Sequence, residues 1–570
     1  MKGCSMKITH GLLKGQVLQR NAKNRAFAQI SGTSISSGDV EIRILKKDKV
    51  VKGFNWKKAG ESKAKKFTAT LADLKAGGPY SVELKISKEK LTVSEVFVGD
   101  VWILAGQSNM QGAGNRVDQP KAHPMVRGFF MRDEWAVAEE PLHHTPEAVD
   151  VFHNVYGTGS DRPTEEQLRK MARENKKGVG PGIFFAQEMY NKSKVPQGLI
   201  ACAHGGTSMA QWSPDLVDQG GASLYGAMMR RFEKLGQPIA GILWYQGESD
   251  ANEDAASLYT KKMKELVEAT RKDMHSPTLP WMIVQIGCHI APGGQYWNSI
   301  QEQQRLFPKS IKNFEVVPAI DLALADGIHI SGKGHAILGK RLARLADRLV
   351  YKNKKAKPGI KLKSIKYIYT AYHPGEPVAS SIEITYRNVV GSLTSKGLPT
   401  GFAIVDEKGN NANLIYKTRF FGSKVILEVS GPIHGASTLK LSYGHGRYSY
   451  CNITDNEGMS LPVMQTVPIN TDMASFITKW KVKTLSGKSA MNNLTSALVQ
   501  KAEVSKQCWR KVHVEQGFVV LPRPLASDRI GIHLFKACIK ADKDTPSVFC
   551  FGSDSNFIIM VIRAPRLLRS

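Results

Sequence analysis

The sequence of 570 residues has no run of about 18 or more apolar residues, so it predicts no membrane-spanning helix. Its amino terminus starts with basic residues but has neither an adequate apolar stretch nor a small-residue cleavage site, so no secretory signal is legible. Cysteine is scarce: the seven cysteines stand singly and form no CxxC pair. This usage argues against a disulfide framework and against a zinc ribbon.

Acidic residues are few relative to basic ones, with 50 Asp and Glu against 79 Lys and Arg, for a formal net charge of +29. Such a charge suits an anionic partner, either nucleic acid or an acidic polysaccharide. The lysines, however, are scattered through most segments and are not gathered into an arginine-rich patch interleaved with aromatics. We therefore expect a generally basic surface and no nucleic-acid partner, with acidic glycans as an open alternative.

Two regions show the alternation of apolar and polar residues that is typical of half-buried strands. Residues 1–92 alternate in short runs such as 40–44 and 80–86, and predict an N-terminal β-sandwich domain. After a basic linker with Pro and Gly, residues 360–468 alternate again and predict a second β-sandwich domain.

The last segment, residues 469–570, predicts a β-rich, jelly-roll-like module of the sugar-binding kind. The prediction rests on Trp480, Trp509 and residues 552–561. Because the sequence stops soon after the last expected strand, we expect an incomplete module. The aromatic residues there serve either sugar binding or a packed core, and the sequence leaves both open.

Residues 93–352 have a different pattern, in which expected apolar strands alternate with expected helices. The expected strands are 96–104, 198–203, 239–245, 280–286 and 315–320, and the expected helices begin at 183 and span 225–235, 255–274 and 334–350. Residues 111–180 are expected to contain long polar loops. Strands alternating with helices predict an α/β fold, with a parallel sheet flanked by helices on both faces.

The stretch from 93 to 115 places a serine at a strand end. Its apolar run ends abruptly in Gly106, Gln107, Ser108 and Asn109. The carboxyl ends of parallel strands are where ligands collect, so Ser108 is a candidate nucleophile that Gly106 leaves open to substrate. The alternative is that Ser108 only caps the following segment.

Polar clusters follow other expected strands and supply partners for this serine. Asp326 and His329 stand three residues apart, so the carboxylate is able to orient the imidazole. A serine hydroxyl needs a base that removes its proton, and the base needs a partner that fixes its tautomer. Ser108, His329 and Asp326 supply those three roles.

An oxyanion formed during acyl transfer needs donors already in place. The backbone N–H groups of Ser108 and Gly206 are candidates, and the Gln246 side-chain amide is a third. Glu248 is a cap, an alternative acid for the base, or an acid of the glycosidase type working with a second carboxylate. Each of these residues also has a purely structural interpretation, and only their joint placement favours a site.

The motifs together resemble a known family. GQSNM at 106–110, GGTxxxxW at 205–212, WYQGESD at 244–250 and DGIH at 326–329 resemble the sialate O-acetylesterase group of SGNH hydrolases. The resemblance extends over most of the chain, including the β-rich regions on either side of 93–352. No GxSxG elbow surrounds Ser108, which argues against an ordinary α/β-hydrolase.

The resemblance implies the roles of the site residues. Ser108 is then the nucleophile, His329 the base and Asp326 its partner, with an oxyanion hole formed by Ser108, Gly206 and Gln246. The common third block of SGNH hydrolases carries an asparagine, whereas Gln246 stands near that place here. The resemblance also implies an SGNH-type parallel sheet between two β-sandwich domains.

The implied function is that of a serine esterase that removes O-acetyl groups from carbohydrates through an acetyl-enzyme intermediate. The substrate is an acetylated carbohydrate, with sialic acid, xylan and other acetylated polysaccharides all open. No metal and no organic cofactor is implied. Alternatives are a glycan-binding protein with a vestigial esterase site and an esterase for other esters. The family implies a periplasmic or secreted protein, and the oligomeric state stays open.

Overall fold

The computed structural model describes residues 6–154, 162–292, 294–369, 379–430, 439–469, 479–486, 510–513 and 531–536. The chain divides into two compact units. The first takes residues 1–365, 382–429 and 438–468, and the second takes 366–381, 430–437 and 469–570.

Within the second unit, β27 (Lys479–Ser486), β28 (Arg510–His513) and β29 (Gly531–Lys536) form an antiparallel sheet in the order β28-β27-β29. Trp509 and residues 552–561, on which the jelly-roll prediction partly rests, lie outside the described residues. The jelly-roll therefore stays a prediction.

The N-terminal strands surround a core of their own. Buried and accessible side chains alternate along most of β3 (Arg25–Thr33) and β7 (Lys66–Lys75), as a half-buried strand requires. The strands pair in the order β1-β3-β7-β6-β4-β8-β9, and a single cluster of buried side chains extends from Met6 to Val98. The remaining strands are β1 (Lys7–His10), β2 (Val17–Gln19), β4 (Gly38–Lys46), β5 (Lys49–Val50), β6 (Lys57–Lys63) and β8 (Gly77–Ile86). The predicted strands at 40–44 and 80–86 are confirmed by β4 and β8.

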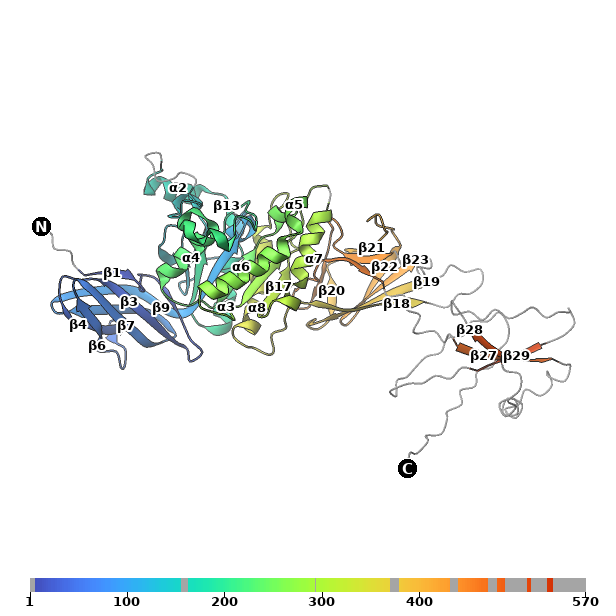
Figure 1. Ribbon diagram of the computed structural model, residues 1–570, viewed down its shortest axis with the longest axis horizontal. Helices are drawn as coiled ribbons and strands as arrows, with labels where there is room; N and C mark the ends of the chain where they lie inside the picture. Colours follow the sequence, from blue (N-terminus) through green and yellow to red (C-terminus); the bar gives the residue numbers. More distant parts are fainter. Residues whose placement is uncertain are drawn as a thin grey trace, which may run out of the picture. The chain divides into compact units, whose positions relative to one another are not determined.

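One long strand, β9 (Glu89–Gly106), belongs to two parts of the fold. Its first half pairs antiparallel with β8, and its second half continues into the parallel sheet that follows (Figure 1). The expected boundary between 92 and 93 therefore falls inside a continuous strand. This strand extends directly from the N-terminal region to the turn that carries Ser108.

The large sheet continues with parallel strands around β9. The order is β11 (Val126–Phe129), β14 (Gln197–Ala201), β9, β15 (Gly241–Tyr245), β16 (Trp281–Gln285) and β17 (Phe314–Pro318), and β12 (Trp135–Val137) pairs antiparallel with β11 at the edge. Leu104 lies opposite Ala201 on one side and Leu243 on the other, so these three strands end at the same level. The fold is therefore mixed α/β with a large sheet, as predicted.

Helices cover this sheet. The predicted helices correspond to α3 (Gly182–Ser193), α4 (Leu224–Leu235) and α8 (Gly332–Leu349), while the helix expected over 255–274 is divided into α5 (Glu253–Ala256) and α6 (Tyr259–Asp273). α3 packs on α8, where a Cβ on Gly339 would lie 2.7 Å from Phe185 N. The two helices thus approach each other closely beside the strands (Figure 1).

Two helices were missed from the sequence for identifiable reasons. α7 (Gln295–Ser310) buries Gln301 and Gln304 among apolar residues, and their amides bond the backbone of Ile286, so polar residues interrupt its apolar inward face. α2 (Glu165–Glu174) is a polar surface helix within a segment expected to be loop. It is held at its start by a reciprocal capping box between Thr164 and Gln167.

The second β-rich region follows α8. Its sheets have the orders β18-β19-β23-β22, β21-β24-β26 and β20-β25. The strands are β18 (Lys361–Tyr369), β19 (Ala379–Arg387), β20 (Leu393–Ser395), β21 (Phe402–Val405), β22 (Ile415–Phe421), β23 (Lys424–Ser430), β24 (Lys440–Tyr443), β25 (Ile453–Asp455) and β26 (Met464–Pro468). Arg344 of α8 bonds Asp455 at 2.9 Å in a buried ion pair. That pair ties this region to the helix that follows the DGIH motif.

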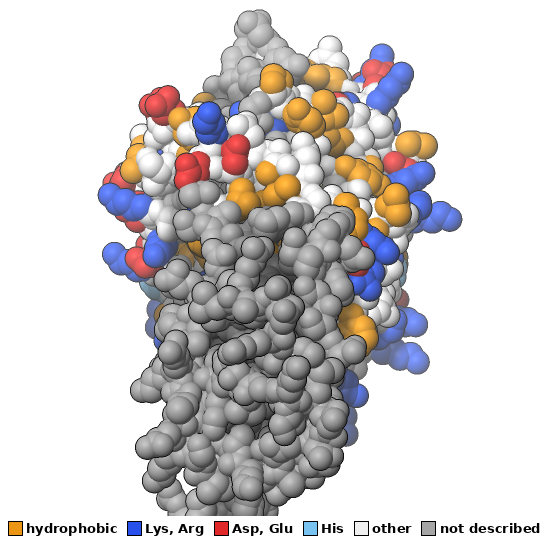
Figure 2. Space-filling model, turned by 90° about the vertical axis from the view of Figure 1, so that its right-hand side faces the viewer, with side chains coloured by type: hydrophobic (Ala, Val, Ile, Leu, Met, Phe, Trp, Pro, Cys, Tyr) orange, Lys and Arg blue, Asp and Glu red, His pale blue; other side chains and the backbone are white. Residues whose placement is uncertain are grey.

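The surface and the sulfur chemistry agree with the composition. On the face shown in Figure 2, lysine and arginine side chains are spread around the margin and do not form one patch. Among the described residues, Cys202, Cys288 and Cys451 are free thiols, and none of the described helices is long and apolar enough to cross a membrane.

Candidate active site

Three predicted side chains meet at the carboxyl edge of the parallel sheet. Ser108 begins α1 (Ser108–Gln111) directly after β9, while Asp326 and His329 lie in the loop between β17 and α8. His329 Nε2 lies 3.0 Å from Ser108 Oγ, and His329 Nδ1 lies 2.9 Å from Asp326 Oδ2. The structure therefore brings a hydroxyl, an imidazole and a carboxylate together in the order that nucleophilic acyl transfer requires.

The Asp326 carboxylate is held in place by several donors. The backbone N–H groups of Ile328 and His329 donate to Oδ1 at 3.1 and 2.9 Å, and Lys177 Nζ donates to Oδ2 at 2.8 Å. Partial burial alone would raise the pKa of this carboxyl, but the bonds from Lys177, His329 and the backbone outweigh it and hold the pKa well below its usual range. Asp326 is thus a fixed anion that faces the imidazole.

Glu248 lies beside this group but bonds a different residue. Asn109 Nδ2 donates to Glu248 Oε1 at 2.9 Å, and the Asn109 side-chain oxygen accepts the Ile330 N–H at 2.9 Å. The fully buried Asn109 therefore connects the Ser108 turn, Glu248 and the His329 loop. Burial raises the pKa of the Glu248 carboxyl to about 7, against the Asn109 hydrogen bond, which works in the lowering direction. Of the two candidate acids, Asp326 is the one that contacts His329 Nδ1.

Two of the three expected oxyanion donors lie at Ser108 or in the turn that packs beside it. Gly205 packs next to Ser108, because a Cβ built on it would lie 3.4 Å from the Ser108 Cβ, and its N–H is held by Gln111 Oε1 at 2.6 Å. At the following residue, Gly206, no atom lies within 4 Å of the position that a Cβ would take. Within the described residues, the backbone N–H groups of Ser108 and Gly206 have no protein acceptor.

The third expected donor is placed differently. Gln246 is completely buried, and its Nε2 donates to the Thr207 carbonyl at 3.1 Å and to Asp250 Oδ2. Both N–H bonds of the amide are used inside the protein, so Gln246 does not point a donor at the site. Its bonds instead fix Thr207 and Asp250 beneath the Gly206 turn, and Asp250 in turn accepts the Met209 N–H at 2.9 Å.

The role expected of Gly106 also needs correction. Its φ is +125°, and an added Cβ would lie 2.2 Å from the Tyr245 carbonyl oxygen of β15. Tyr245 O also accepts the N–H of Gln107 at 2.8 Å. The glycine therefore permits close approach of two strands below Ser108 and does not open a path for substrate.

An aromatic group that the sequence did not single out borders the site. His204 follows β14, its N–H donates to the Gly106 carbonyl at 3.0 Å, and its Nδ1 lies 3.0 Å from His153 Nδ1. Burial lowers the pKa of both imidazoles, which favours a neutral pair. Phe152 packs edge-on against His204, with ring centroids 5.4 Å apart. In the sequence, the GGT motif next to His204 was the feature that could have indicated this aromatic group.

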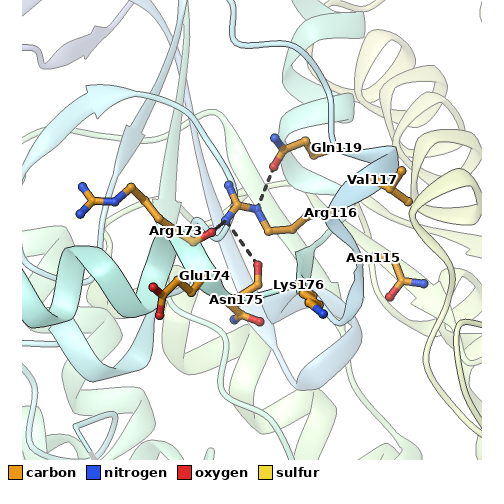
Figure 3. A pocket seen from close by; sticks show the side chains of 8 residues that line it. All are labelled: Asn115, Arg116, Val117, Gln119, Arg173, Glu174, Asn175 and Lys176. Carbon is orange, nitrogen blue, oxygen red and sulfur yellow. Dashed lines mark hydrogen bonds between the residues drawn. The ribbon is translucent and has the colours of Figure 1, made fainter.

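A surface cavity of about 490 Å³ lies beside the ribbon of β10 (Gly114–Asn115) and β13 (Lys177–Val179). Figure 3 shows Arg116 among its lining side chains, with its hydrogen bond to Gln119, which measures 2.9 Å. The Arg116 guanidinium also donates to the Ala172 carbonyl at 2.8 Å. Arg116 therefore binds the carbonyl end of α2. None of the lining residues belongs to the predicted catalytic set, although Lys176 in the lining immediately precedes Lys177.

The arrangement can be compared with known proteins. Residues 98–348 match the family described as "Carbohydrate esterase, sialic acid-specific acetylesterase". A probable carbohydrate esterase of Arabidopsis thaliana is 32% identical over 268 residues, which cover 43% of this chain and 88% of that protein. The chain belongs to this carbohydrate esterase family. It is accordingly a carboxylic ester hydrolase, and the resemblance found in the sequence is confirmed.

Other members of the carbohydrate esterase family match in part. Sialate O-acetylesterase of Homo sapiens is 27% identical over 244 residues, which cover 36% of this chain and 42% of that protein, so the match spans less than half of that relative. A carbohydrate acetylesterase from Xanthomonas citri has a similar fold, with a TM-score of 0.57 and 19% identity over 80% of this chain and 99% of that one.

Proposed function

We propose that this esterase removes O-acetyl groups from a carbohydrate through an acetyl-enzyme formed on Ser108. The observation that carries the proposal is the continuous contact from Ser108 Oγ to His329 Nε2, at 3.0 Å, and from His329 Nδ1 to Asp326, at 2.9 Å. Family membership supports a carbohydrate ester as the substrate. Sialic acid and acetylated polysaccharides are both candidates.

In the first half of the reaction, His329 Nε2 removes the Ser108 proton while Oγ attacks the acetyl carbonyl carbon. The resulting oxyanion lies against the N–H groups of Ser108 and Gly206. When the bond between the acetyl carbon and the sugar oxygen breaks, His329 gives its proton to that leaving oxygen. Asp326 stays ionised throughout and stabilises the imidazolium.

In the second half, His329 removes a proton from water, which attacks the acetyl-enzyme. Collapse of the second tetrahedral intermediate breaks the bond to Oγ and returns the proton from His329 to Ser108. Acetate is released and the free enzyme is restored. The fixed carboxylate of Asp326 keeps the imidazole in the same tautomer for both halves.

The test is acetate release from a panel of acetylated glycans and from an aryl acetate. Ser108→Ala is expected to lower kcat by at least about 10³-fold on every substrate, since the nucleophile is lost. Ser213→Ala is the matched control, because that hydroxyl bonds Asp215 at 3.1 Å outside the catalytic group. Wild-type activity in Ser108→Ala would overturn the mechanism, and an enzyme active on aryl acetate but on no acetylated glycan would overturn the substrate class.

A further inference from the structure

The second β-rich region places a loop against the catalytic domain. Residues 444–450 follow β24 and are held by Asn298 of α7, whose Nδ2 donates to the Gly444 carbonyl at 2.9 Å and whose Oδ1 accepts the Gly446 N–H at 2.7 Å. A Cβ on Gly294, just before α7, would lie 2.8 Å from the Gly446 Cα. The loop is thus fixed at close range to the start of α7.

The same loop is connected to the catalytic loop through backbone hydrogen bonds. His289 N donates to the Arg447 carbonyl at 2.8 Å, and Ile290 N donates to the Gly327 carbonyl at 2.7 Å. Gly327 stands next to Asp326. Two consecutive residues after β16 therefore join the 444–450 loop to the loop that carries the base and its acid.

Two tyrosines of this loop are left in solvent. Tyr448 is 64% exposed and Tyr450 is 70% exposed, whereas the Ser449 carbonyl between them faces the protein and lies 3.5 Å from Cys288 Sγ. Ile290, bonded to Gly327, is 67% exposed. Three large side chains without charge thus stand on segments that contact each other and the catalytic loop.

We propose that Tyr448, Tyr450 and Ile290 form a saccharide-binding rim, which holds a sugar ring next to the one whose acetyl ester lies at Ser108. A tyrosine combines an apolar face with a hydroxyl at its tip. A pyranose ring likewise has C–H bonds on its face and hydroxyls at its edge, so the two surfaces match. None of the three side chains is charged, and the neighbouring Arg447 guanidinium donates to the Pro292 carbonyl and lies over the Trp297 ring, so the rim itself fits a neutral sugar.

The position of the rim indicates which ligand binds to it. The proposal rests on the proposed function: a chain that deacetylates a polymeric carbohydrate must accommodate the sugars beside the reacting one. The backbone bonds through His289 and Ile290 make the rim continuous with the catalytic loop. The rim therefore adds affinity for an oligosaccharide, while a small aryl ester does not reach it.

The experiment compares two substrates in each variant. For Tyr448→Ala with Tyr450→Ala, kcat/KM on an acetylated oligosaccharide of several neutral sugars is expected to fall about tenfold, mainly through KM, and kcat/KM on p-nitrophenyl acetate to stay within about twofold. Replacing both tyrosines by phenylalanine keeps the ring faces and is expected to keep most oligosaccharide activity. Tyr416→Ala is the matched control, because Tyr416 is 60% exposed on β22.

Two results would overturn the rim: unchanged oligosaccharide kinetics in the double alanine variant, or an equal loss on both substrates, which shows a general disturbance of the site. A wild-type enzyme that deacetylates sialic acid but no neutral oligosaccharide would also overturn the rim, and only the rim. A wild-type enzyme that cleaves the aryl acetate but no acetylated glycan, sialic acid included, would overturn the proposed function itself. The two failures are therefore distinguishable.

Discussion

Lys177 Nζ lies 2.8 Å from Asp326 Oδ2, on the same carboxylate that contacts His329 Nδ1. The lysine comes from β13, 149 residues earlier in the chain, and is 49% exposed. Its positive charge therefore opposes the effect of the Asp326 charge on the imidazole. In the proposed mechanism, Lys177 acts on His329 through Asp326 and is a positioning residue.

Replacing Lys177 by methionine is expected to lower kcat/KM on an aryl acetate by about two- to fivefold. Without the lysine, the Asp326 carboxylate loses one of the donors that hold it against His329 Nδ1. The effect is modest because the Lys177–Asp326 pair is partly exposed. The measurement is kcat/KM on an aryl acetate at low and high salt.

The control for this prediction is Lys176→Met, which removes a neighbouring lysine that forms no ion pair among the described residues. Added salt should reduce the difference between wild type and Lys177→Met, because it screens an exposed pair. Equal kcat/KM for wild type and Lys177→Met at low salt would contradict the assigned role.

Glu248→Gln is expected to make stability less sensitive to pH. The pKa of the carboxyl rises from 4.5 to about 7 in the folded chain, so the folded state binds the proton more strongly than the unfolded state. The carboxyl contributes on the order of 3 kcal/mol to the free energy of unfolding. This contribution is fully present below about pH 4.5 and is lost as the pH rises through 7. Glutamine does not ionise, and its amide oxygen still accepts the Asn109 bond.

The measurement for Glu248 is the free energy of unfolding at pH 5 and pH 8. The decrease between the two values should be smaller in Glu248→Gln than in wild type, and the exposed Glu139→Gln should behave as wild type. If Glu248→Gln shows the same decrease as wild type, the buried carboxyl is not the group that titrates.

Gly106→Ala is expected to abolish activity by displacing the nucleophile turn. The new Cβ would meet the Tyr245 carbonyl at 2.2 Å, and a φ of +125° is a conformation that alanine rarely adopts. We expect at least a hundredfold loss of activity or loss of folded protein, measured by circular dichroism and aryl acetate hydrolysis. Gly409→Ala is the control: φ is +83° with open space around it, so only about 1–2 kcal/mol of strain is expected. A fully active Gly106→Ala would refute the close-approach argument.

Much of the catalytic geometry was predictable because it follows from local patterns. The run before Ser108 predicted a strand that ends in a turn, and β9 with α1 confirms it. The spacing of Asp326 and His329 permitted a carboxylate–imidazole contact, and the structure places the two atoms 2.9 Å apart. A residue three positions away in a loop is within reach whatever the rest of the fold does.

Other features depended on which buried groups needed partners. Gln246 was expected to donate to substrate, but Thr207 and Asp250 lie beside it in the interior and use both of its N–H bonds. An unpaired buried amide or carboxylate is costly, so packing selected the internal partners. No pattern within the WYQGESD motif reveals that outcome.

By itself, the sequence determined the strand and helix rhythm of 93–352, the serine at a strand end and the Asp-His pair, because each depends on neighbours along the chain. Only the tertiary structure decided that Lys177 meets Asp326, that Asn109 joins Glu248 to the His329 loop, and that residues 289–290 link residues 444–450 to Gly327. These contacts connect residues more than a hundred positions apart. They arise from the way turns, loops and helices pack around the sheets, which local periodicity does not encode.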